Sequence, residues 1–342
     1  MSVKSSSILS KIMKFAVPLI VTVGLCYVLF KGLDFNEMIA IISEQCDFRW
    51  IALALVLSIL SHVWRAFRWR IQLRALGVDA PRFALVLSIF GTYAVNLVFP
   101  RLGEVWRTGY IATRQKAPFA TVFGSMVADR LADTVTVALL TLLTFCLASG
   151  SLLAYLRQNE ATYQALMGLV TSPWLWAAAV ATAAACWWLL TRRRGESSII
   201  TKIQNFAKGL WDGFAVIASM PGKGRWLGYT VMLWGSYFLQ LYVAFFAFPF
   251  TASVVETYGV TAVLVTFVLS SISMGVPSNG GIGPWQWAVI FALGIYGVER
   301  TAAGAFANLV LGTQTALLVA LGLFTFICIF IENKKKQNIE NE

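Results

Sequence analysis

Long apolar runs separated by short polar segments dominate this sequence. The runs lie near 15–31, 50–64, 83–99, 132–149, 174–190, 226–250, 260–276, 284–297 and 302–331. A helix needs about 20 mainly apolar residues to cross the hydrocarbon core of a bilayer. Several runs reach that length once their flanks are included, so the pattern predicts an all-α polytopic integral membrane protein. The runs 83–99, 260–276 and 284–297 are shorter and end at proline or glycine, which favours broken helices.

Loop charge predicts which side of the membrane each loop faces, because cytoplasmic loops are enriched in lysine and arginine. The N-terminal tail and the lysines at 334–336 are basic, so both termini are expected on the cytoplasmic side of the cytoplasmic membrane. The loop 101–118 is also basic. It reaches the same side only if the run 83–99 enters the membrane, breaks at Pro100 and returns. Residues 260–297 would form a matching hairpin from the opposite side, giving about six full spans and two re-entrant hairpins, or about eight helices.

The order of spans and hairpins is the same in the two halves of the chain, but the second half starts from the opposite side. The halves are residues 15–149 and 173–331 of a single membrane domain that occupies residues 1–342. In transporters built from inverted repeats, the broken segments of the two halves meet near the membrane midplane and form the substrate site. The alternative explanation is that runs of similar length recur by chance in any protein with many spans.

Residues 197–220 carry a different pattern from the spans. Apolar side chains recur every three or four positions, and lysines and an aspartate occupy other parts of the helical wheel. This pattern predicts an amphipathic helix on the inner leaflet of the membrane. A gate or a partner-binding segment is the alternative.

Composition narrows the classes of function. Hydrophobic residues make up 58% and charged residues 13% of the chain, whereas soluble domains average about 25% charged residues. The net charge of +11 lies in short loops beside apolar runs, so it indicates membrane orientation rather than nucleic-acid binding. His62 is the only histidine and the five cysteines form no C-x-x-C pair, which nearly excludes a histidine metal site and a Ser-His-Asp triad. We therefore expect no catalytic residue, no metal ion, no cofactor and no enzymatic activity.

A first polar cluster follows Pro100 and consists of Arg101, Glu104 and Arg107. If a helix begins directly after the proline, these residues share one face because they are spaced three apart. Two guanidinium groups around one carboxylate leave free donors that can bind a phosphate in bidentate geometry. The alternative is an arginine–glutamate ladder that only anchors the hairpin.

A second cluster, formed by Asp129, Arg130 and Asp133, adjoins the apolar run 132–149. The two aspartates are one helical turn apart and lie on one face. Because the idealised cost of burying a lone ion is on the order of 20 kcal/mol, these carboxylates need partners. The arginines of the first cluster are candidates. The aspartates are then either part of a structural ion pair between two helices or a proton or cation site.

A third cluster lies between two prolines in the second hairpin. Its candidate site residues are Ser278, Asn279, Gly280 and Gly281. Glycine permits backbone conformations closed to other residues and lets a ligand approach closely. Pro284 suits the first turn of a new helix, whose free N–H groups attract anions. Glycine and proline are also common in membrane helices without any such role.

A fourth polar segment runs from Arg65 to Arg74 and mixes basic with aromatic side chains. At the end of a span, such a run is typical of an interfacial anchor on anionic lipid headgroups. A vestibule that collects phosphate-bearing substrates is the alternative.

Together these motifs resemble the flippase-like membrane domain of lysylphosphatidylglycerol synthases, over about residues 15–331. The matching segments are 65–70, Pro100 to Glu104 with Arg107, Asp129 and Arg130 with Asp133, and the glycine-rich break 280–283. Family members often carry an acidic residue just after that break, where this chain has Gln286. Proton coupling that relied on that carboxylate would be lost here.

The resemblance is to a stand-alone member without an aminoacyl-transferring domain, so it implies translocation rather than lipid synthesis. We therefore expect a lipid translocase that moves a phospholipid or a polyprenyl-phosphate-linked headgroup between leaflets. Its partners would be membrane lipids with an anionic or phosphate-bearing headgroup and no nucleic acid, and a homo-oligomer is compatible with the sequence. The alternatives are a membrane enzyme for glycosyl or acyl transfer to lipid-linked substrates, and a non-transporting accessory subunit in cell-envelope biogenesis.

Overall fold

The computed structural model describes residues 34–158, scattered positions between 164 and 184, and residues 219–276 and 278–340. Within these ranges the regular elements are all helices, which confirms the all-α class. They are α2 (Phe35–Gln45), α3 (Phe48–Ala75), α4 (Arg82–Val98), α5 (Leu102–Arg114), α6 (Phe119–Gln158), α10 (Lys223–Ala244), the 3-10 turn η1 (Phe245–Ala247), α11 (Pro249–Tyr258), α12 (Val260–Ser273), α13 (Pro284–Ile295) and α14 (Arg300–Glu340).

Four helices of the described chain are long and apolar enough to cross a membrane, which confirms the polytopic class. They span Phe48–Ala75, Phe119–Ala148, Lys223–Ala247 and Arg300–Lys335. The pair α11 and α12 would add a fifth, although the two helices are bent by 113° at their junction. The expected span at 15–31, most of the expected span at 174–190 and nearly all of the amphipathic helix at 197–220 lie outside the described residues, so the count of about six full spans stays a prediction.

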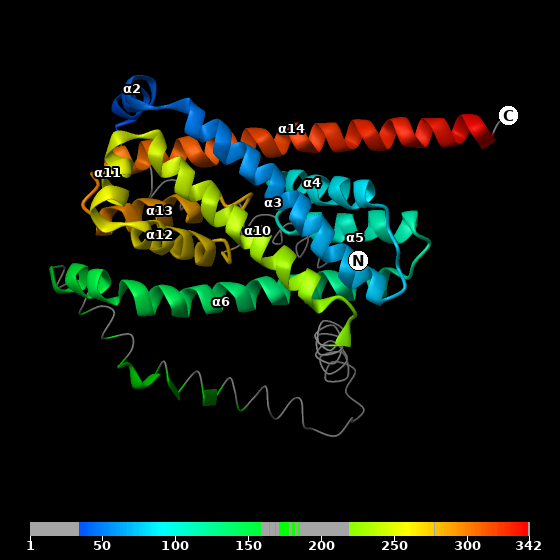
Figure 1. Ribbon diagram of the computed structural model, residues 1–342, viewed down its shortest axis with the longest axis horizontal. Helices are drawn as coiled ribbons and strands as arrows, with labels where there is room; N and C mark the ends of the chain where they lie inside the picture. The colour runs from blue at the N-terminus through cyan, green and yellow to red at the C-terminus, as the bar shows by residue number, and fades with distance from the viewer. Residues whose placement is uncertain are drawn as a thin grey trace, which may run out of the picture.

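The long helices frame the molecule, as Figure 1 shows. In that view α14 runs along one side and α6 along the other, with α3 and α10 between them. The last two are antiparallel neighbours, because the N–H of Asp47 before α3 donates to the carbonyl of Ala247 after α10 (2.8 Å), and Ile71 lies beside Gly222 at the opposite ends. The short pairs α4/α5 and α12/α13 occupy opposite ends of the view.

The first hairpin breaks where the sequence predicts. Pro100 has no N–H group and disfavours helical geometry at the preceding residue. Phe99 is accordingly extended, with φ −123° and ψ 103°. Arg101 is left-handed, with φ 63°, and α5 begins at Leu102. The break is therefore confirmed, while the re-entrant path of this hairpin through a membrane stays a prediction.

The second hairpin breaks over a longer segment, between Ser273 and Pro284. Gly280, Gly281 and Gly283 have φ values of 62°, 88° and 94°, which side chains with a Cβ rarely adopt. As predicted, α13 begins at Pro284. The order long helix, broken pair, long helix thus recurs in both halves, as an inverted repeat requires. The repeat itself, with its proposed halves 15–149 and 173–331, stays a prediction.

Two segments outside the long spans form helices of their own. The segment before α3 forms α2, because the Asp34 side chain accepts hydrogen bonds from the N–H groups of Asn36 (2.9 Å) and Glu37 (3.1 Å) and so caps the helix. The segment after η1 forms α11, which begins at Pro249 and ends at Tyr258, just before Gly259. A proline in the first turn and a glycine after the last are both favourable at those positions.

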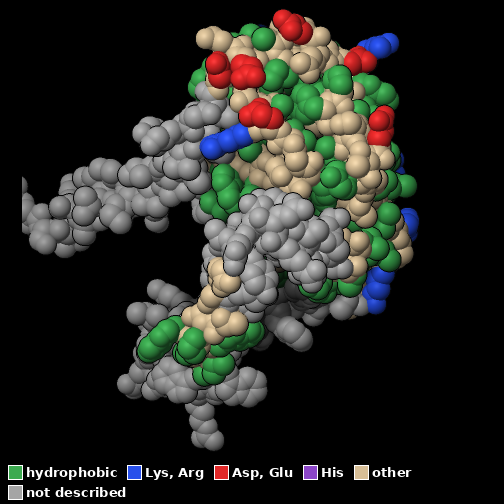
Figure 2. Space-filling view, turned by 90° about the vertical axis from the view of Figure 1, so that its left-hand side faces the viewer, with side chains coloured by type: hydrophobic (Ala, Val, Ile, Leu, Met, Phe, Trp, Pro, Cys, Tyr) green, Lys and Arg blue, Asp and Glu red, His purple; other side chains and the backbone are tan. Residues whose placement is uncertain are grey.

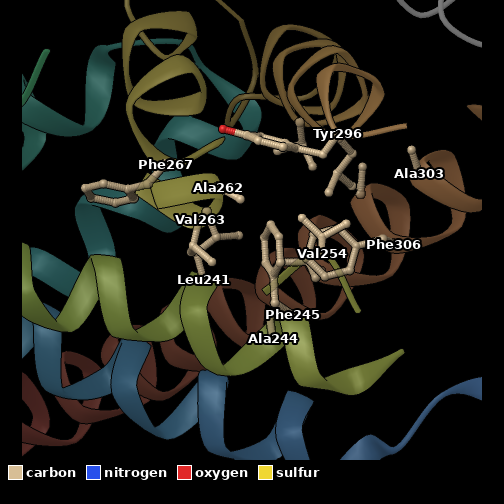
Figure 3. Packing of buried hydrophobic residues seen from close by; sticks show 14 of the residues in the cluster. Leu241, Ala244, Phe245, Val254, Ala262, Val263, Phe267, Tyr296, Ala303 and Phe306 are labelled. Carbon is tan, nitrogen blue, oxygen red and sulfur yellow. The ribbon is translucent and has the colours of Figure 1, made fainter. Parts of the chain in front are cut away.

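The described helices pack two main hydrophobic cores. The larger core joins α10, η1, α11, α12, α13 and α14 with residues of α3 and α6 from the first half, and Figure 3 shows its central side chains interdigitating. Phe245 and Phe306 meet there with ring centroids 5.3 Å apart. The smaller core joins α3, α4, α5 and α6 around Trp69 and Ile111. Large apolar side chains such as Phe145 on α6 point outward instead, as lipid-facing residues do.

The two ends of the helical bundle differ in charge. Acidic side chains gather at the end that carries α2, which faces the viewer in Figure 2. The opposite end holds the turns that follow α3 and α5. There Arg74 donates hydrogen bonds to exposed Asp79 (2.8 and 3.0 Å) and lowers the pKa of that carboxyl. The orientation of these ends, with the basic end toward the cytoplasm, stays a prediction.

Candidate functional site

Seven charged side chains from three helices form one network inside the described part of the bundle. We call it the charged network; its members are Arg65 and Arg68 of α3, Glu104 and Arg107 of α5, and Asp129, Arg130 and Asp133 of α6. Arg68, Arg107 and Asp129 are completely buried. Charges at such a depth persist only when they pair with one another or face a cavity.

The centre of the network is a pair of arginines shared by a pair of aspartates. Arg68 contacts Asp129 (2.6 Å) and Asp133 (2.8 Å) through the same nitrogen. Arg65 contacts Asp133 at 2.6 Å and Asp129 at 3.4 Å. Because both guanidinium groups bridge both carboxylates, α3 is fixed against α6. The aspartates therefore have the arginine partners that the sequence required.

The arginines that pair with these aspartates are mostly not the ones that the sequence analysis predicted. The sequence analysis placed Arg65 and Arg68 on lipid headgroups or in a vestibule, and the structure shows that this interpretation is wrong for both. Their exposed fractions are 3% and 0%. The side chains project toward α6 because Asp129 and Asp133 lie there at the same depth. The expected arginines of the first cluster contribute only Arg107, whose Nη2 is 3.6 Å from Asp129.

Glu104 links this centre to the first break. It pairs with Arg130 at 2.7 Å and accepts a hydrogen bond from the amide of Asn96 at 3.1 Å. The side-chain amide oxygen of Asn96 accepts from the N–H of Gly103 at 2.8 Å. A Cβ at Gly103 would collide with the backbone of α4, so only glycine lets α5 approach this closely. The sequence analysis missed Asn96, although its place one turn before the proline was a usable signal.

Arg107 differs from the other members of the network in that all its side-chain donors lack hydrogen-bond partners among the described residues. None of its three side-chain nitrogens has a hydrogen-bond partner among the described residues, although the side chain is completely buried. The guanidinium lies 4.5 Å from the centroid of the Trp69 ring, a cation–π contact that leaves its N–H groups free. The network contains four guanidinium groups and three carboxylates. If all are ionised, one positive charge is uncompensated, which suits an anionic ligand.

Arg101 lies apart from Glu104 and Arg107, so the predicted common face is wrong for this residue. The helix begins one residue later than that prediction needs, and the left-handed backbone of Arg101 directs its exposed side chain elsewhere. Its Nη2 donates to the carbonyl of Gly275, in the second break, at 2.8 Å.

The two breaks contact each other directly. Asn279 donates from its amide to the carbonyl of Leu97 at 3.2 Å. Gly280 packs against the Leu97 side chain without room for a Cβ. Together with the bond from Arg101 to Gly275, these contacts form what we call the clasp. They confirm that the broken segments meet, while their role as a substrate site stays a prediction.

The remaining residues of the second break are neutral. Ser278 and Gly280 are partly buried and Gly281 is buried. Gln286, which follows the break, is 6% exposed. Its amide oxygen accepts from the N–H of Gly283 at 2.9 Å and its amide nitrogen donates to Asn308. The side chain thus caps α13 and ties it to α14, a role that requires no titration.

Two tyrosines that the sequence analysis did not single out extend the network. Tyr237 of α10 accepts hydrogen bonds from Arg65 at 3.3 and 3.4 Å. Its hydroxyl lies 3.3 Å from that of Tyr93 on α4. The charged network therefore contacts five helices, although its charges come from only three.

Comparisons with known proteins identify a family whose model covers most of the chain. The family described as the lysylphosphatidylglycerol synthase TM region matches residues 15–322, which include both breaks and the charged network. The chain is also 32% identical to the glycosyltransferase AglD of Haloferax volcanii over 107 residues, which cover 31% of this chain and 17% of that relative. No solved structure matches the chain. On the extent of the family match, this integral membrane protein belongs to the lysylphosphatidylglycerol synthase TM region family.

Proposed function

We propose that this protein is a lipid translocase that moves a phospholipid or a polyprenyl-phosphate-linked headgroup between the two leaflets. The physical task is to lower the free energy of drawing a charged headgroup through hydrocarbon. Polar groups held inside the bundle can replace the water that the headgroup loses, while the acyl or prenyl tails remain in lipid. The protein needs no cofactor and performs no bond chemistry on this proposal.

The observation that carries the proposal is the state of Arg107. It is completely buried, its N–H groups have no hydrogen-bond partner among the described residues, and the network around it holds four guanidinium groups against three carboxylates. Leaving buried donors unpaired is costly, so the arrangement favours a ligand with acceptor oxygens and negative charge. A phosphodiester offers both, and a guanidinium can bind two of its oxygens at once.

The clasp supports a transport role for the second break. Movement between leaflets requires that the site open to each side in turn, and in inverted-repeat transporters the two halves rock against each other. Arg101, Asn279 and Gly280 lie where the halves touch. We propose that these residues, with Ser278 and Gly281, line the path of the headgroup, and that the basic end of the bundle faces the cytoplasm of the cytoplasmic membrane.

The proposal is tested by reconstituting the purified protein into liposomes with fluorescent phospholipids and bleaching the outer leaflet. Wild-type protein should accelerate lipid movement relative to empty liposomes. Arg107→Met, which removes the charge without leaving a cavity, should slow movement about ten- to a hundredfold, the factor expected for a charged hydrogen bond. Arg107→Lys should recover part of the rate, because a point charge lacks the bidentate fork.

The matched control lies two turns along the same helix. Arg114 forms a partly exposed ion pair with Glu332 of α14, so Arg114→Ala removes a guanidinium from α5 without touching the charged network. It should leave the rate near that of wild type. Lipid movement by Arg107→Met at the rate of the control would contradict the proposal.

A second candidate is glycosyl transfer to a lipid-linked acceptor. The similarity to a glycosyltransferase over 107 residues favours it. Incubation of purified protein with activated sugars and polyprenyl phosphate separates the two functions. Formation of a glycosylated lipid would support transfer, and its absence together with lipid movement would support translocation.

A further inference from the structure

One face of α3 carries a buried stripe of polar side chains within a helix long enough to cross the membrane. The stripe consists of Ser58, Ser61, His62, Arg65, Arg68 and Gln72, all of which are buried. Their spacing of three and four residues places them on one side of the helix. From the first to the last, the stripe extends about 21 Å at about 1.5 Å per residue, roughly two thirds of a hydrocarbon core.

The half of the stripe farther from the basic end is neutral. Ser58 is hydrogen-bonded to the amide of Gln314 on α14, which in turn accepts from Gln240 on α10 at 3.0 Å. Across one helical turn, the Ser58 hydroxyl lies 3.5 Å from Nε2 of His62. Three helices therefore bring hydroxyl, amide and imidazole groups to one place in the interior.

The neutral half is continuous with the charged network. The His62 ring lies against the ring of Tyr93, with centroids 4.4 Å apart. The hydroxyl of Tyr93 reaches that of Tyr237, which accepts from Arg65. We call this series of contacting side chains the neutral track. In order of contact, its members are Gln240, Gln314, Ser58, His62, Tyr93 and Tyr237. A ligand whose phosphate reached the charged network could therefore extend along the neutral track.

The neutral track has capacity for a ligand. Nδ1 of His62 has no hydrogen-bond partner among the described residues, and this side chain is 3% exposed. Tyr93, Tyr237 and Gln314 are each partly exposed, so the hydrogen bonds that they make within the track can be exchanged for bonds to a ligand. Every group of the track can accept or donate a hydrogen bond without carrying charge, which matches the chemistry of a hydroxyl group.

We propose that the neutral track binds the hydroxyl groups of the lipid headgroup, so that the substrate is an anionic lipid with a polyol or sugar beyond its phosphate. This inference rests on the proposed translocase function. A headgroup with an ammonium group at the same place would instead lie beside a network with excess positive charge. The charged network therefore disfavours a cationic headgroup, while the neutral track favours hydroxyl groups.

The test compares two fluorescent lipids of equal charge in the proteoliposome assay. Phosphatidylglycerol has a glycerol headgroup with free hydroxyl groups, whereas phosphatidylmethanol has the same phosphodiester and no hydroxyl. Wild-type protein should move phosphatidylglycerol faster by about fivefold, the factor that one hydrogen bond of ordinary strength supplies. Equal rates for the two lipids would overturn the inference and leave the translocase proposal standing. Movement of neither lipid would overturn both.

Two variants locate the preference in the neutral track. Gln314→Leu removes its central amide and Ser58→Ala removes a single oxygen, so the second keeps the test valid if the first does not fold. In each, the ratio of the two rates should fall toward one. The control is Thr313→Val, because this neighbouring hydroxyl bonds to the carbonyl of Leu309 in its own helix; its ratio should equal that of wild type. A wild-type ratio in both track variants would overturn the inference.

Discussion

The two broken hairpins reach a similar shape by different chemistry. Around the first break, Glu104 and Arg107 belong to a buried network of ion pairs. Around the second, Asn279 and Gln286 make neutral amide hydrogen bonds, and glycines supply the unusual backbone angles. On the proposed function, one half of the molecule would provide charge for the substrate, while the other provides backbone freedom and a close approach.

The energetic consequences of the two designs are unequal. Breaking a buried ion pair strands a charge in the interior and typically costs about 3–5 kcal/mol. Losing a neutral hydrogen bond that leaves one buried group unpaired costs about 1–3 kcal/mol. Substitutions in the first hairpin's network should therefore reduce stability more than substitutions in the second, with one informative exception.

The largest effect is expected for Asp129→Asn. This carboxylate is contacted by Arg65, Arg68 and Arg107, so its neutralisation leaves a surplus of buried positive charge. The free energy of unfolding should fall by about 3–5 kcal/mol, measured by thermal unfolding in detergent. Asp79→Asn is the control, because that exposed carboxylate pairs with Arg74 in a turn; its melting temperature should stay near that of wild type. Equal melting temperatures for the two variants would contradict the structural role of Asp129.

A smaller effect is expected for Gln286→Leu in the second hairpin. The change leaves the N–H of Gly283 and the side chain of Asn308 without their partner. A loss of about 1–3 kcal/mol should follow in the same unfolding experiment. Trp287→Leu alters the next side chain, which is half exposed, and should cost less. If Gln286→Leu destabilises the protein more than Asp129→Asn, the contrast between the hairpins is wrong.

The clasp should respond to Gly280→Ala. The substitution places a Cβ against Leu97 and forces alanine into a left-handed conformation, which costs roughly 1–2 kcal/mol. Because the contact between the breaks is disturbed, lipid movement should slow as well. Gly294→Ala in α13 is the matched control, since nothing lies near its added methyl group. Wild-type transport by Gly280→Ala would remove the clasp from the mechanism.

The exception is Arg107→Met, for which we expect the smallest change in stability. Removing this guanidinium leaves three arginines against three carboxylates, and an apolar side chain of similar length can fill the space beside Trp69. Replacing buried charges by well-packed apolar groups is often neutral or stabilising. The melting temperature should therefore stay the same or rise while lipid movement slows. A melting temperature that falls as far as that of Asp129→Asn would assign Arg107 a structural role.

Sequence patterns predicted the features that depend on local chemistry. The break at Pro100 and the start of α13 at Pro284 follow from the geometry of proline, and the need of Asp129 for an arginine partner follows from the cost of burying a charge. The identity of that partner could not be read in the same way. Arg68 is far from Asp129 in the sequence, and only the rotation of α3 against α6 brings them together.

Two further residues show where such reasoning stops. Arg101 has a left-handed backbone that no periodicity reveals, so the predicted common face with Glu104 and Arg107 is wrong for this residue. The polar stripe of α3 was visible as spacing, since Ser58, His62 and Arg65 recur every three or four residues. Its meaning depended on knowing that this face is buried, because the same pattern on an exposed face would describe an interfacial helix.

Binding of a lipid phosphate at Arg107 is the central claim, and native mass spectrometry of the detergent-purified protein with phosphatidylglycerol tests it most directly. The wild-type protein and the Arg114→Ala control should bind the lipid with similar affinity. Arg107→Met should bind it at least about tenfold more weakly, as expected when a charged hydrogen bond is lost. Equal affinity in Arg107→Met and wild-type protein would contradict the account.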